Sequence, residues 1–496
     1  MMSKTNNKPK IAIITLIQEG AVKVGGEHAM MFPYVEQAIK AANTIREKAI
    51  VIPYIIAPKP ARMEKLPRVD VLKEKMKETN DGKMILVNNG TKEPYGHPWN
   101  WEKYGYEAHK EIIALTEKEK LDGIIIMVHG FASIPAVLDL TAAKKDGKMK
   151  NIPIQSFAVT HSTFDEHKDV RPQRRLFERE IHNHAKMIAI SPYMANHLQE
   201  MEMIPKNEEP IPLYNALPKE GWFSTKIPRP TILNMLHERN QKVNEGPFYG
   251  VKLPVKEILS GEKELVLYFG RPQKYVKGTD AVIACAKEDN KRHYMLICSG
   301  SEEELEWHLE LIDDLENVTL AWEHNSKLVL GTVQLTENNP EARITALFLS
   351  RREPMGLVSR EVVLMQDEGS VLPVVADNCG FEDPWQKEYS FVVTNPCVGE
   401  EENKNANLKG KREDEIYISP DCVTETLEIL DKISEMQIRE LRKRVQQYAE
   451  KIKENYSEDR YWTFYLQALG LFNQDLEKYI EEKIAENNLG KVPNVA

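Results

Sequence analysis

The segment ELVLYFGRPQKYVKGTDAVIACAK, residues 264–287, joins an apolar run to an amphipathic run through a short turn. The apolar run is typical of a strand buried on both faces of a parallel sheet, and the second run has helical spacing. Arg271 and Lys277 lie in the turn, just past the predicted carboxyl end of the strand. Two cations before a helix N-terminus can bind an anion such as a diphosphate, although a single loop Arg or Lys is usually only a solvated charge.

The same alternation of strand and helix patterns extends in both directions from this segment. Predicted strands occupy residues 11–17, 49–56, 123–129 and 152–160 before it, and 293–300, 317–322, 344–350 and 370–376 after it. Strands that alternate with helices predict parallel βαβ units. After residue 218 the pattern dissolves, and prolines with mixed charge indicate a linker and a long irregular segment.

The expected fold class is therefore α/β, with two doubly wound, Rossmann-like domains in tandem. The first is expected at residues 1–225 and the second at 226–455, with final helices at 456–496. Ligands of open α/β sheets bind at the carboxyl ends of the strands. Two such domains predict that the main site lies in a central cleft that both domains face.

The composition of the chain argues against several classes of protein. The chain has 496 residues and a formal net charge of −10, which argues against non-specific nucleic-acid binding. Five cysteines without metal-ligand or redox spacing indicate reduced thiols, and no apolar run is long enough to span a bilayer. These features predict a cytoplasmic protein without a transmembrane segment. We find no spacing typical of a metal site.

A second segment, SRREPMGLVSREVVLM at residues 350–365, follows another predicted strand. Gly356 would let the backbone approach a ligand closely, and free amides of residues 355–357 at the helix start would form a second anion-binding element. Glu353 would lie at the mouth of the site and Glu361 about two turns further along the helix. Two glutamates near a helix start are, by themselves, better explained by a favourable interaction with the helix dipole.

Taken in order, these segments resemble the retaining glycosyltransferases of the GT-B fold, family four. The resemblance rests first on GRxxxxxKG after one strand and EPxGLxxxE after a later one. Further segments that match in order are KVGGEH (23–28), AVTHSTF (158–164), AKMIAISPYMANHL (185–198), IPLYNALP (211–218), MLICSGS (295–301) and GSVLPVVADNCG (369–380). The resemblance covers nearly the whole chain. It implies that the last helices cross back to the first domain, where the stripe YWTFYLQALGLF (461–472) would dock.

The resemblance also implies an activity of the hexosyltransferase class. A sugar would move from a nucleotide-diphospho-sugar, of the UDP-sugar or GDP-mannose type, to an acceptor, without an essential metal or other cofactor. The site residues that it implies are Arg271 and Lys277 at the diphosphate, Glu361 at the ribose, Glu353 and His161 beside the transferred sugar, Gly25 and Gly26 near the diphosphate, and the amides of Met355, Gly356 and Leu357 at a phosphate or sugar hydroxyl.

Some positions depart from the pattern of this family. Ala216 and Cys379 stand where glycine is usual, and Arg360 and Val362 flank Glu361 where small or apolar residues and alanine are usual. These departures leave the shape of the loops and the nucleotide preference open.

The acceptor is not specified by the sequence. His129, at a strand end, and Asp165, in the loop after His161, are candidate acceptor contacts, although Asp165 is more simply an ordinary loop charge. The basic cluster at residues 170–175 could receive a phosphorylated acceptor or an anionic lipid head group, but a solvated helix start is the commoner explanation. The acceptor therefore stays open among a sugar, a lipid head group and a protein, and peripheral contact with a membrane is compatible with each. The alternatives to a transferase are a catalytically silent sugar-nucleotide-binding protein and a sugar-nucleotide epimerase.

Overall fold

A computed structural model describes most of the chain, in ranges separated by gaps. The described residues are 8–17, 26–59, 67–88, 97–149, 151–164, 172–217, 222–274, 276–337, 339, 341–351, 353–376, 379–381, 384–389, 391–393 and 418–495. The chain forms two compact units. The first unit comprises Met1–Pro218 together with Tyr456–Ala496, and the second comprises Lys219–Asn455.

The first unit is built on a seven-stranded sheet with the order β3-β2-β1-β4-β5-β6-β7, in which all neighbours are parallel. Its strands are β1 (Lys10–Ile17), β2 (Ile50–Pro58), β3 (Lys83–Val87), β4 (Gly123–His129), β5 (Ile154–Thr160), β6 (Lys186–Ala189) and β7 (Ile211–Pro212). The central strands β1 and β4 are almost entirely buried, as their uninterrupted Ile and Val runs require. The strand order reverses between β1 and β4, so the chain leaves these two strands in opposite directions.

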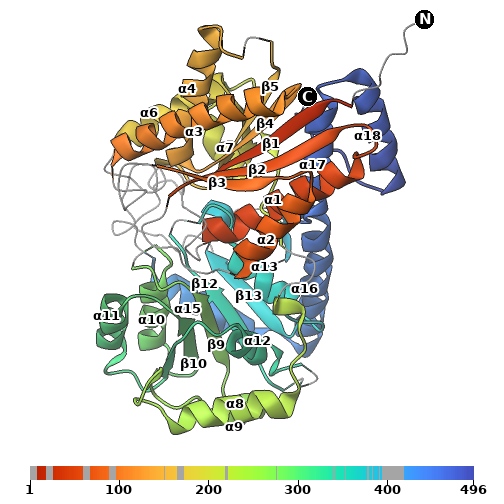
Figure 1. Ribbon diagram of the computed structural model, residues 1–496. Coiled ribbons are helices and arrows are strands. Elements are labelled where there is room, and N and C mark those ends of the chain that lie inside the picture. Colours follow the sequence, from red (N-terminus) through yellow and green to blue (C-terminus); the bar gives the residue numbers. More distant parts are fainter. Residues whose placement is uncertain are drawn as a thin grey trace, which may run out of the picture. The chain divides into compact units, whose positions relative to one another are not determined.

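Helices cover this sheet. They are α1 (Gly26–Thr44), α2 (Pro67–Glu78), α3 (Pro98–Glu119), α4 (Ile134–Lys145), α6 (Pro172–Glu180), α7 (Pro192–Glu200), α17 (Asp459–Gly470) and α18 (Gln474–Glu486), with short 3-10 turns η1 (Phe131–Ser133) and η2 (Ile181–Asn183). Figure 1 shows α1 beside α2 and α17, and α3 beside α4. The last helices therefore belong to the same unit as the first strand.

The aromatic stripe of α17 provides the contact that joins the C-terminal segment to the first unit. Tyr461 stacks on Tyr34 of α1 with ring centroids 4.0 Å apart, and Phe464 meets Phe157 of β5 edge-on at 4.9 Å. The Trp462 Nε1–H donates to Thr44 Oγ1 over 3.2 Å. The expectation that the C-terminal helices cross back to the first unit is confirmed.

The second unit contains another seven-stranded sheet, with the order β14-β13-β12-β9-β10-β11-β8. Its strands are β8 (Phe248–Gly250), β9 (Leu265–Gly270), β10 (His293–Cys298), β11 (Val318–Trp322), β12 (Ile344–Phe348), β13 (Val371–Ala376) and β14 (Phe391–Val393). All pairs are parallel except β8, which runs antiparallel to β11 at the edge. Apart from the edge strands β8 here and β7 in the first unit, the two sheets have the same strand order, and in the second unit it reverses between β9 and β12.

The helices of the second unit are α8 (Arg229–Gln241), α9 (Val255–Leu259), α10 (Thr279–Glu288), α11 (Glu302–Ile312), α12 (Ser326–Gln334), α13 (Leu357–Leu364), α14 (Pro384–Tyr389), α15 (Pro420–Lys432) and α16 (Glu435–Asn455), with 3-10 turns η3 (Trp222–Ser224) and η4 (Cys379–Phe381). Among the described residues, no helix is long and apolar enough to cross a membrane.

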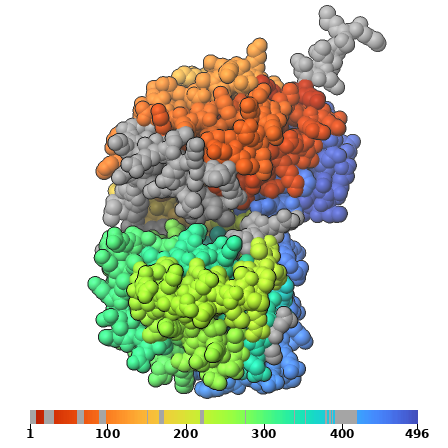
Figure 2. Space-filling model, turned by 60° about the horizontal axis from the view of Figure 1, so that its bottom comes forward, coloured from red at the N-terminus to blue at the C-terminus, as the bar shows by residue number. Residues whose placement is uncertain are grey.

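The expectation of a long irregular segment after residue 218 is wrong. Residues 229–259 form α8, β8 and α9, and Figure 2 shows this yellow-green part of the chain on the surface of the second unit. Three of the prolines that suggested irregular structure lie at helix starts: Pro228 precedes α8, Pro230 is in its first turn and Pro254 precedes α9. Proline is tolerated there, since the first amides of a helix have no partner within the helix.

Candidate functional site

The two segments singled out in the sequence leave neighbouring strands of the second sheet. Strands β9 and β12 are paired in parallel, with Ile344 opposite Leu265. The chain continues from β9 to β10 on one side and from β12 to β13 on the other. Ligands of open α/β sheets bind outside the strand ends at such a reversal of strand order. The loop after β9 and the loop after β12 therefore form the candidate site of this unit.

Arg351 fastens these two loops together. Its backbone N–H donates to the carbonyl of Val276 over 2.9 Å, and its guanidinium donates to both carboxylate oxygens of Asp280 over 2.8 and 2.6 Å. Gly278, between Val276 and Asp280 in the sequence, has φ +73°. A Cβ on this residue would lie 2.0 Å from the carbonyl oxygen of Leu349. Only glycine fits so close an approach of two backbones. Sequence reasoning did not single out Arg351, although its bidentate ion pair sets the position of the neighbouring Lys277.

Lys277 and Glu353 form an ion pair at the centre of the site. Lys277 Nζ lies 2.7 Å from Glu353 Oε2, and both side chains are largely buried. Burial alone would raise the pKa of Glu353, but Lys277 and the backbone N–H groups of Met355 and Gly356 more than offset this and lower it. The carboxylate therefore stays ionised and occupies donors that the sequence analysis expected to be free. The expectation of free amides at Met355 and Gly356 is wrong for this structure.

Arg360 explains how these amides are presented. It is fully buried and donates from Nη1 to the carbonyl oxygens of Met355 and Gly356, the latter over 3.0 Å. The carbonyl groups of Met355 and Gly356 are thus bound by Arg360, whereas their N–H groups donate to Glu353. Gly356 has φ +69°, and a Cβ there would lie 2.4 Å from the ring of Phe381. The arginine that departs from the family pattern is thus a structural part of the anion-binding turn.

Glu361 and Arg271 are the two charged candidates without an ion pair among the described residues. Glu361 lies on α13, half-buried, and burial raises its pKa from 4.5 to about 7. Arg271 is exposed at the start of the loop after β9, where its carbonyl accepts a 3.1 Å hydrogen bond from the hydroxyl of Tyr268. A carboxyl group buried without a cation is costly unless a ligand provides hydrogen-bond donors. Leu357 begins α13 directly after the turn.

The candidate residues of the first unit form a histidine pair. His129 is the last residue of β4, and His161 directly follows the adjacent strand β5. His129 Nδ1 lies 3.1 Å from His161 Nε2. His129 is 1 % exposed, and burial, with a smaller effect of His161, lowers its pKa so that its ring stays neutral. Gly26 begins α1, whereas Gly25 and Asp165 lie outside the described residues.

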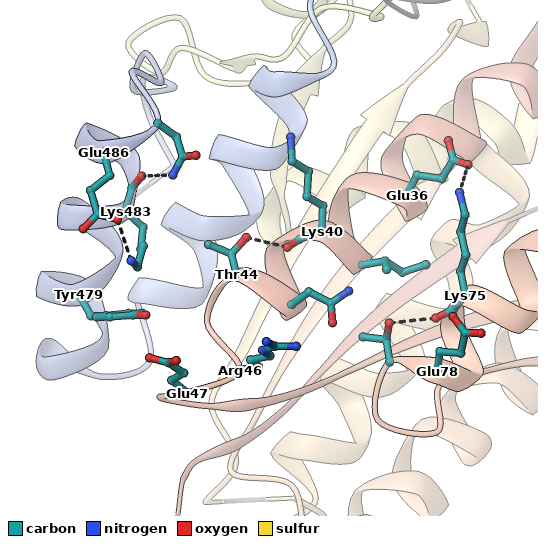
Figure 3. Close-up of a pocket in the computed structure, with 14 residues that line it drawn as sticks. Glu36, Lys40, Thr44, Arg46, Glu47, Lys75, Glu78, Tyr479, Lys483 and Glu486 are labelled. Atoms are coloured by element: carbon teal, nitrogen blue, oxygen red, sulfur yellow. Dashed lines mark hydrogen bonds and ion pairs between the residues drawn. The ribbon is translucent and has the colours of Figure 1, made fainter.

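A pocket of about 940 Å³ lies elsewhere in the first unit, between α1, α2 and α18. Figure 3 shows that charged side chains of both signs line it. Several of them are already paired, as in the 3.3 Å contact of Lys75 with Glu36 and the 2.7 Å contact of Lys483 with Glu486. The pocket includes Arg46 and Glu47, which precede β2, so it lies at the amino ends of the strands. This is the end opposite to that at which ligands of α/β sheets bind.

The raised pKa of Glu361 predicts a pH-dependent effect on stability. Because the pKa in the folded protein exceeds the ordinary value, the protonated group stabilises the fold below about pH 4.5, and this contribution is lost as the pH rises through about 7. Glu361→Gln should therefore raise the free energy of unfolding at pH 8, relative to wild type, by about 2–3 kcal/mol more than at pH 4. Urea unfolding at both pH values measures this difference.

The matched control for this experiment is Glu435→Gln, because Glu435 is on the surface of the same unit with its side chain 88 % exposed. It should change stability equally at both pH values. Identical pH dependence of Glu361→Gln and wild type would contradict the assignment of a raised pKa to Glu361.

Three solved structures are similar to this chain over most of its length. The sucrose-phosphate synthase of Thermosynechococcus elongatus has a TM-score of 0.60 and 14% identity, with 95% of this chain and 100% of that chain covered. The glycosyltransferase from Rickettsia africae ESF-5 has a TM-score of 0.56 and 13% identity, covering 95% and 99%. The E. coli trehalose-6-phosphate protein bound with UDP-2-fluoro glucose has a TM-score of 0.56 and 11% identity, covering 90% and 97%.

The sequence matches no protein-family model and no curated protein. At 11–14% identity, the likeness to solved structures concerns the fold alone. Together with the two doubly wound sheets and the returning C-terminal helices, it confirms the fold class expected from the sequence. The chain has the GT-B fold of glycosyltransferases.

Proposed function

We propose that this protein is a retaining glycosyltransferase of the family-four type, which transfers a sugar from a nucleotide-diphospho-sugar to an acceptor. The observation that carries the proposal is the anion site of the second unit. Lys277 Nζ and two inward-facing amides surround one carboxylate there, at the reversal of strand order between β9 and β12. A diphosphate needs the same donors as a carboxylate. The donor is of the UDP-sugar or GDP-mannose type.

In the proposed reaction one bond breaks, one bond forms and one proton is transferred. The bond between the anomeric carbon and the phosphate oxygen breaks, and its electron pair goes to that oxygen. The acceptor oxygen bonds to the anomeric carbon on the same face, and its proton passes to the leaving phosphate. Lys277 and Arg271 stabilise the charge that develops on the diphosphate, so no essential metal ion is required. Glu361 accepts hydrogen bonds from the ribose.

Glu353 has two roles in this proposal. In the ligand-free protein its carboxylate neutralises Lys277 and satisfies the amides of Met355 and Gly356. When the donor binds, a phosphate oxygen or sugar hydroxyl takes over these donors, and the carboxylate turns to the sugar, where it stabilises the positive charge of the oxocarbenium-like transition state. The donor therefore competes with a carboxylate of the protein itself.

The first unit supplies the remaining groups. We assign His161 to the transferred sugar and His129 to the orientation of His161, because His129 Nδ1 lies 3.1 Å from His161 Nε2 and His129 is buried and neutral. The acceptor, with a hydroxyl group as nucleophile, is a sugar, a lipid head group or a protein. The E. coli structure with UDP-2-fluoro glucose supports a uracil nucleotide as the first donor to test.

The experiment that tests the proposed function is a screen of nucleotide sugars for release of nucleoside diphosphate, with cell extract as the source of acceptor. We expect release of the nucleoside diphosphate with a UDP-sugar or GDP-mannose. The anomeric configuration of the sugar, α or β, should be the same in the product as in the donor.

Activity should persist in excess EDTA, because Lys277 and Arg271 replace the metal. Complete loss that manganese or magnesium restores would contradict the metal-independent mechanism. Tight nucleotide binding without any release identifies a silent binder, and an inverted sugar centre on the nucleotide identifies an epimerase.

Lys277→Ala should weaken binding of UDP about tenfold to a hundredfold, because a hydrogen bond to a charged group contributes about 1.5–3 kcal/mol. Isothermal calorimetry measures this affinity. Since this change leaves Glu353 without its cation, Lys277→Ala/Glu353→Gln removes both charges and should also bind weakly. The control is Lys287→Ala, at the exposed last turn of α10, which should bind like wild type. Wild-type affinity of the Lys277 variants would overturn the diphosphate assignment.

Glu353→Gln separates the two roles of Glu353. We expect turnover to fall while UDP binds at least as tightly as to wild type, because the variant no longer competes for Lys277 with a full charge. Turnover with a UDP-sugar and calorimetry with free UDP distinguish the two effects. Loss of UDP affinity in parallel with turnover would show that Glu353 supports the nucleotide rather than the sugar.

A further inference from the structure

A short segment after β5, residues 161–164, is held by side chains from three other elements. Each of its four residues takes part in at least one such hydrogen bond: His161 Nε2 with His129 Nδ1 (3.1 Å), the Ser162 carbonyl with Arg174 Nη2 (3.0 Å), Thr163 Oγ1 with His197 Nε2 (2.7 Å) and the Phe164 amide with Glu178 Oε2 (2.8 Å). A loop usually has few such restraints, because loops lie on the surface and are mobile. This degree of restraint is typical of a segment whose position matters for chemistry.

Arg174 and Glu178 are the centre of this arrangement. They lie one turn apart on α6, with Arg174 Nε 2.7 Å from Glu178 Oε1, and each residue is only 4 % exposed. Arg174 Nη2 also donates to Ser162 Oγ over 3.1 Å. The guanidinium lies 4.2 Å from the ring centroid of Phe131, which closes its other side. The pair therefore fixes the backbone on both sides of Thr163.

A stabilising role alone does not explain this pair well. Two buried charges lose their hydration, and well-packed apolar residues of similar volume are often as stabilising. Apolar residues cannot, however, donate to the carbonyl of Ser162 or accept from the amide of Phe164. Beyond stability, the pair therefore fixes the backbone conformation of this short segment.

We propose that the Arg174–Glu178 pair is a positioning element for His161, which it holds through residues 162–164. The proposal rests on the proposed function, in which His161 faces the transferred sugar. It differs from both explanations that the sequence left open for the basic cluster at residues 170–175, since Arg174 is neither solvated nor available to an anionic acceptor. Residues 170 and 171 lie outside the described part of the chain.

The test uses the double variant Arg174→Met/Glu178→Leu, which removes both charges together and leaves no buried charge unpaired. We expect turnover to fall about tenfold to a hundredfold, since a displacement of about 1 Å at a reacting group has an effect of this size. UDP binding should be unchanged, because Arg271 and Lys277, which we assign to the diphosphate, belong to the second unit, and neither substituted residue belongs to the segment of Gly25 and Gly26. The control is Arg179→Met, on the exposed face of the same helix, which should turn over like wild type.

A combination with His161→Ala decides whether the pair acts through His161. If it does, the triple variant loses no more turnover than His161→Ala alone, because residues that act as one unit are not additive. Multiplied losses, or wild-type turnover of the folded Arg174→Met/Glu178→Leu variant, would overturn the proposal. If that variant does not fold, Arg174→Lys retains the charge but loses the planar fork, and the same comparison applies.

A second measurement does not depend on transferase activity. The NMR titration of the His161 ring should have a different midpoint in Arg174→Met/Glu178→Leu than in wild type, and the wild-type midpoint in Arg179→Met. An unchanged midpoint in both variants overturns the positioning role. A shifted midpoint in a protein that releases no nucleoside diphosphate from any donor supports the positioning of His161 and contradicts only the proposed function.

Discussion

Burial of the central strands on both faces is the constraint on which the rest of this structure depends. Strands β1 and β9 are surrounded by apolar neighbours, so helices must cover both faces of each sheet. Polar groups can then reach a ligand only from the strand ends and the loops that follow. Because the strand order reverses once in each unit, between β1 and β4 and between β9 and β12, each unit has one place where adjacent loops separate. In the second unit, Arg271, Lys277 and Glu353 lie in the loops at this place. In the first unit, His129 ends β4 and His161 follows the neighbouring strand β5.

The loops at these places are held by charged side chains rather than by apolar packing. Arg351 joins the two loops of the second unit through Asp280, and Arg360 holds the turn at Gly356. In the first unit, Arg174 has the same role for the segment after β5. Arginine suits this task because its planar guanidinium donates several hydrogen bonds in fixed directions. Three buried arginines thus set the geometry of loops that carry the candidate groups Lys277, Glu353 and His161.

Much of this fold could be predicted from the sequence, because the strand runs are long, apolar and regularly spaced. The pattern of apolar residues did not predict the structure where prolines or short apolar runs can be explained in more than one way. The prolines before residue 264 suggested irregular structure, but three of them, Pro228, Pro230 and Pro254, occupy helix starts, where they do not disturb the helix. Strand β3, with only partly buried side chains for most of its length, has a much shorter apolar run than the strand β2 beside it.

The candidate site, too, could be predicted from the sequence only in part. Spacing and resemblance selected Lys277 and Glu353, and the structure brings them within 2.7 Å. The engagement of Glu353 with the amides of its own turn could not be foreseen, because sequence spacing does not reveal which acceptor a backbone N–H will find. Arg360 and Arg174 were likewise difficult to interpret. A charged residue in a sequence is usually exposed, and only the three-dimensional contacts show that these two are buried.

The return of the C-terminal segment to the first unit has a consequence for biosynthesis. The first unit packs Tyr34 of α1 against Tyr461 of α17, and α17 is synthesised after the whole of the second unit. The second unit is formed by one continuous stretch, Lys219–Asn455. During translation, the later unit can therefore complete its core while the earlier one still lacks two of its helices. The order in which the units are completed is thus the reverse of the order in which their first strands are made, and the face of α1 that packs on α17 stays uncovered until then.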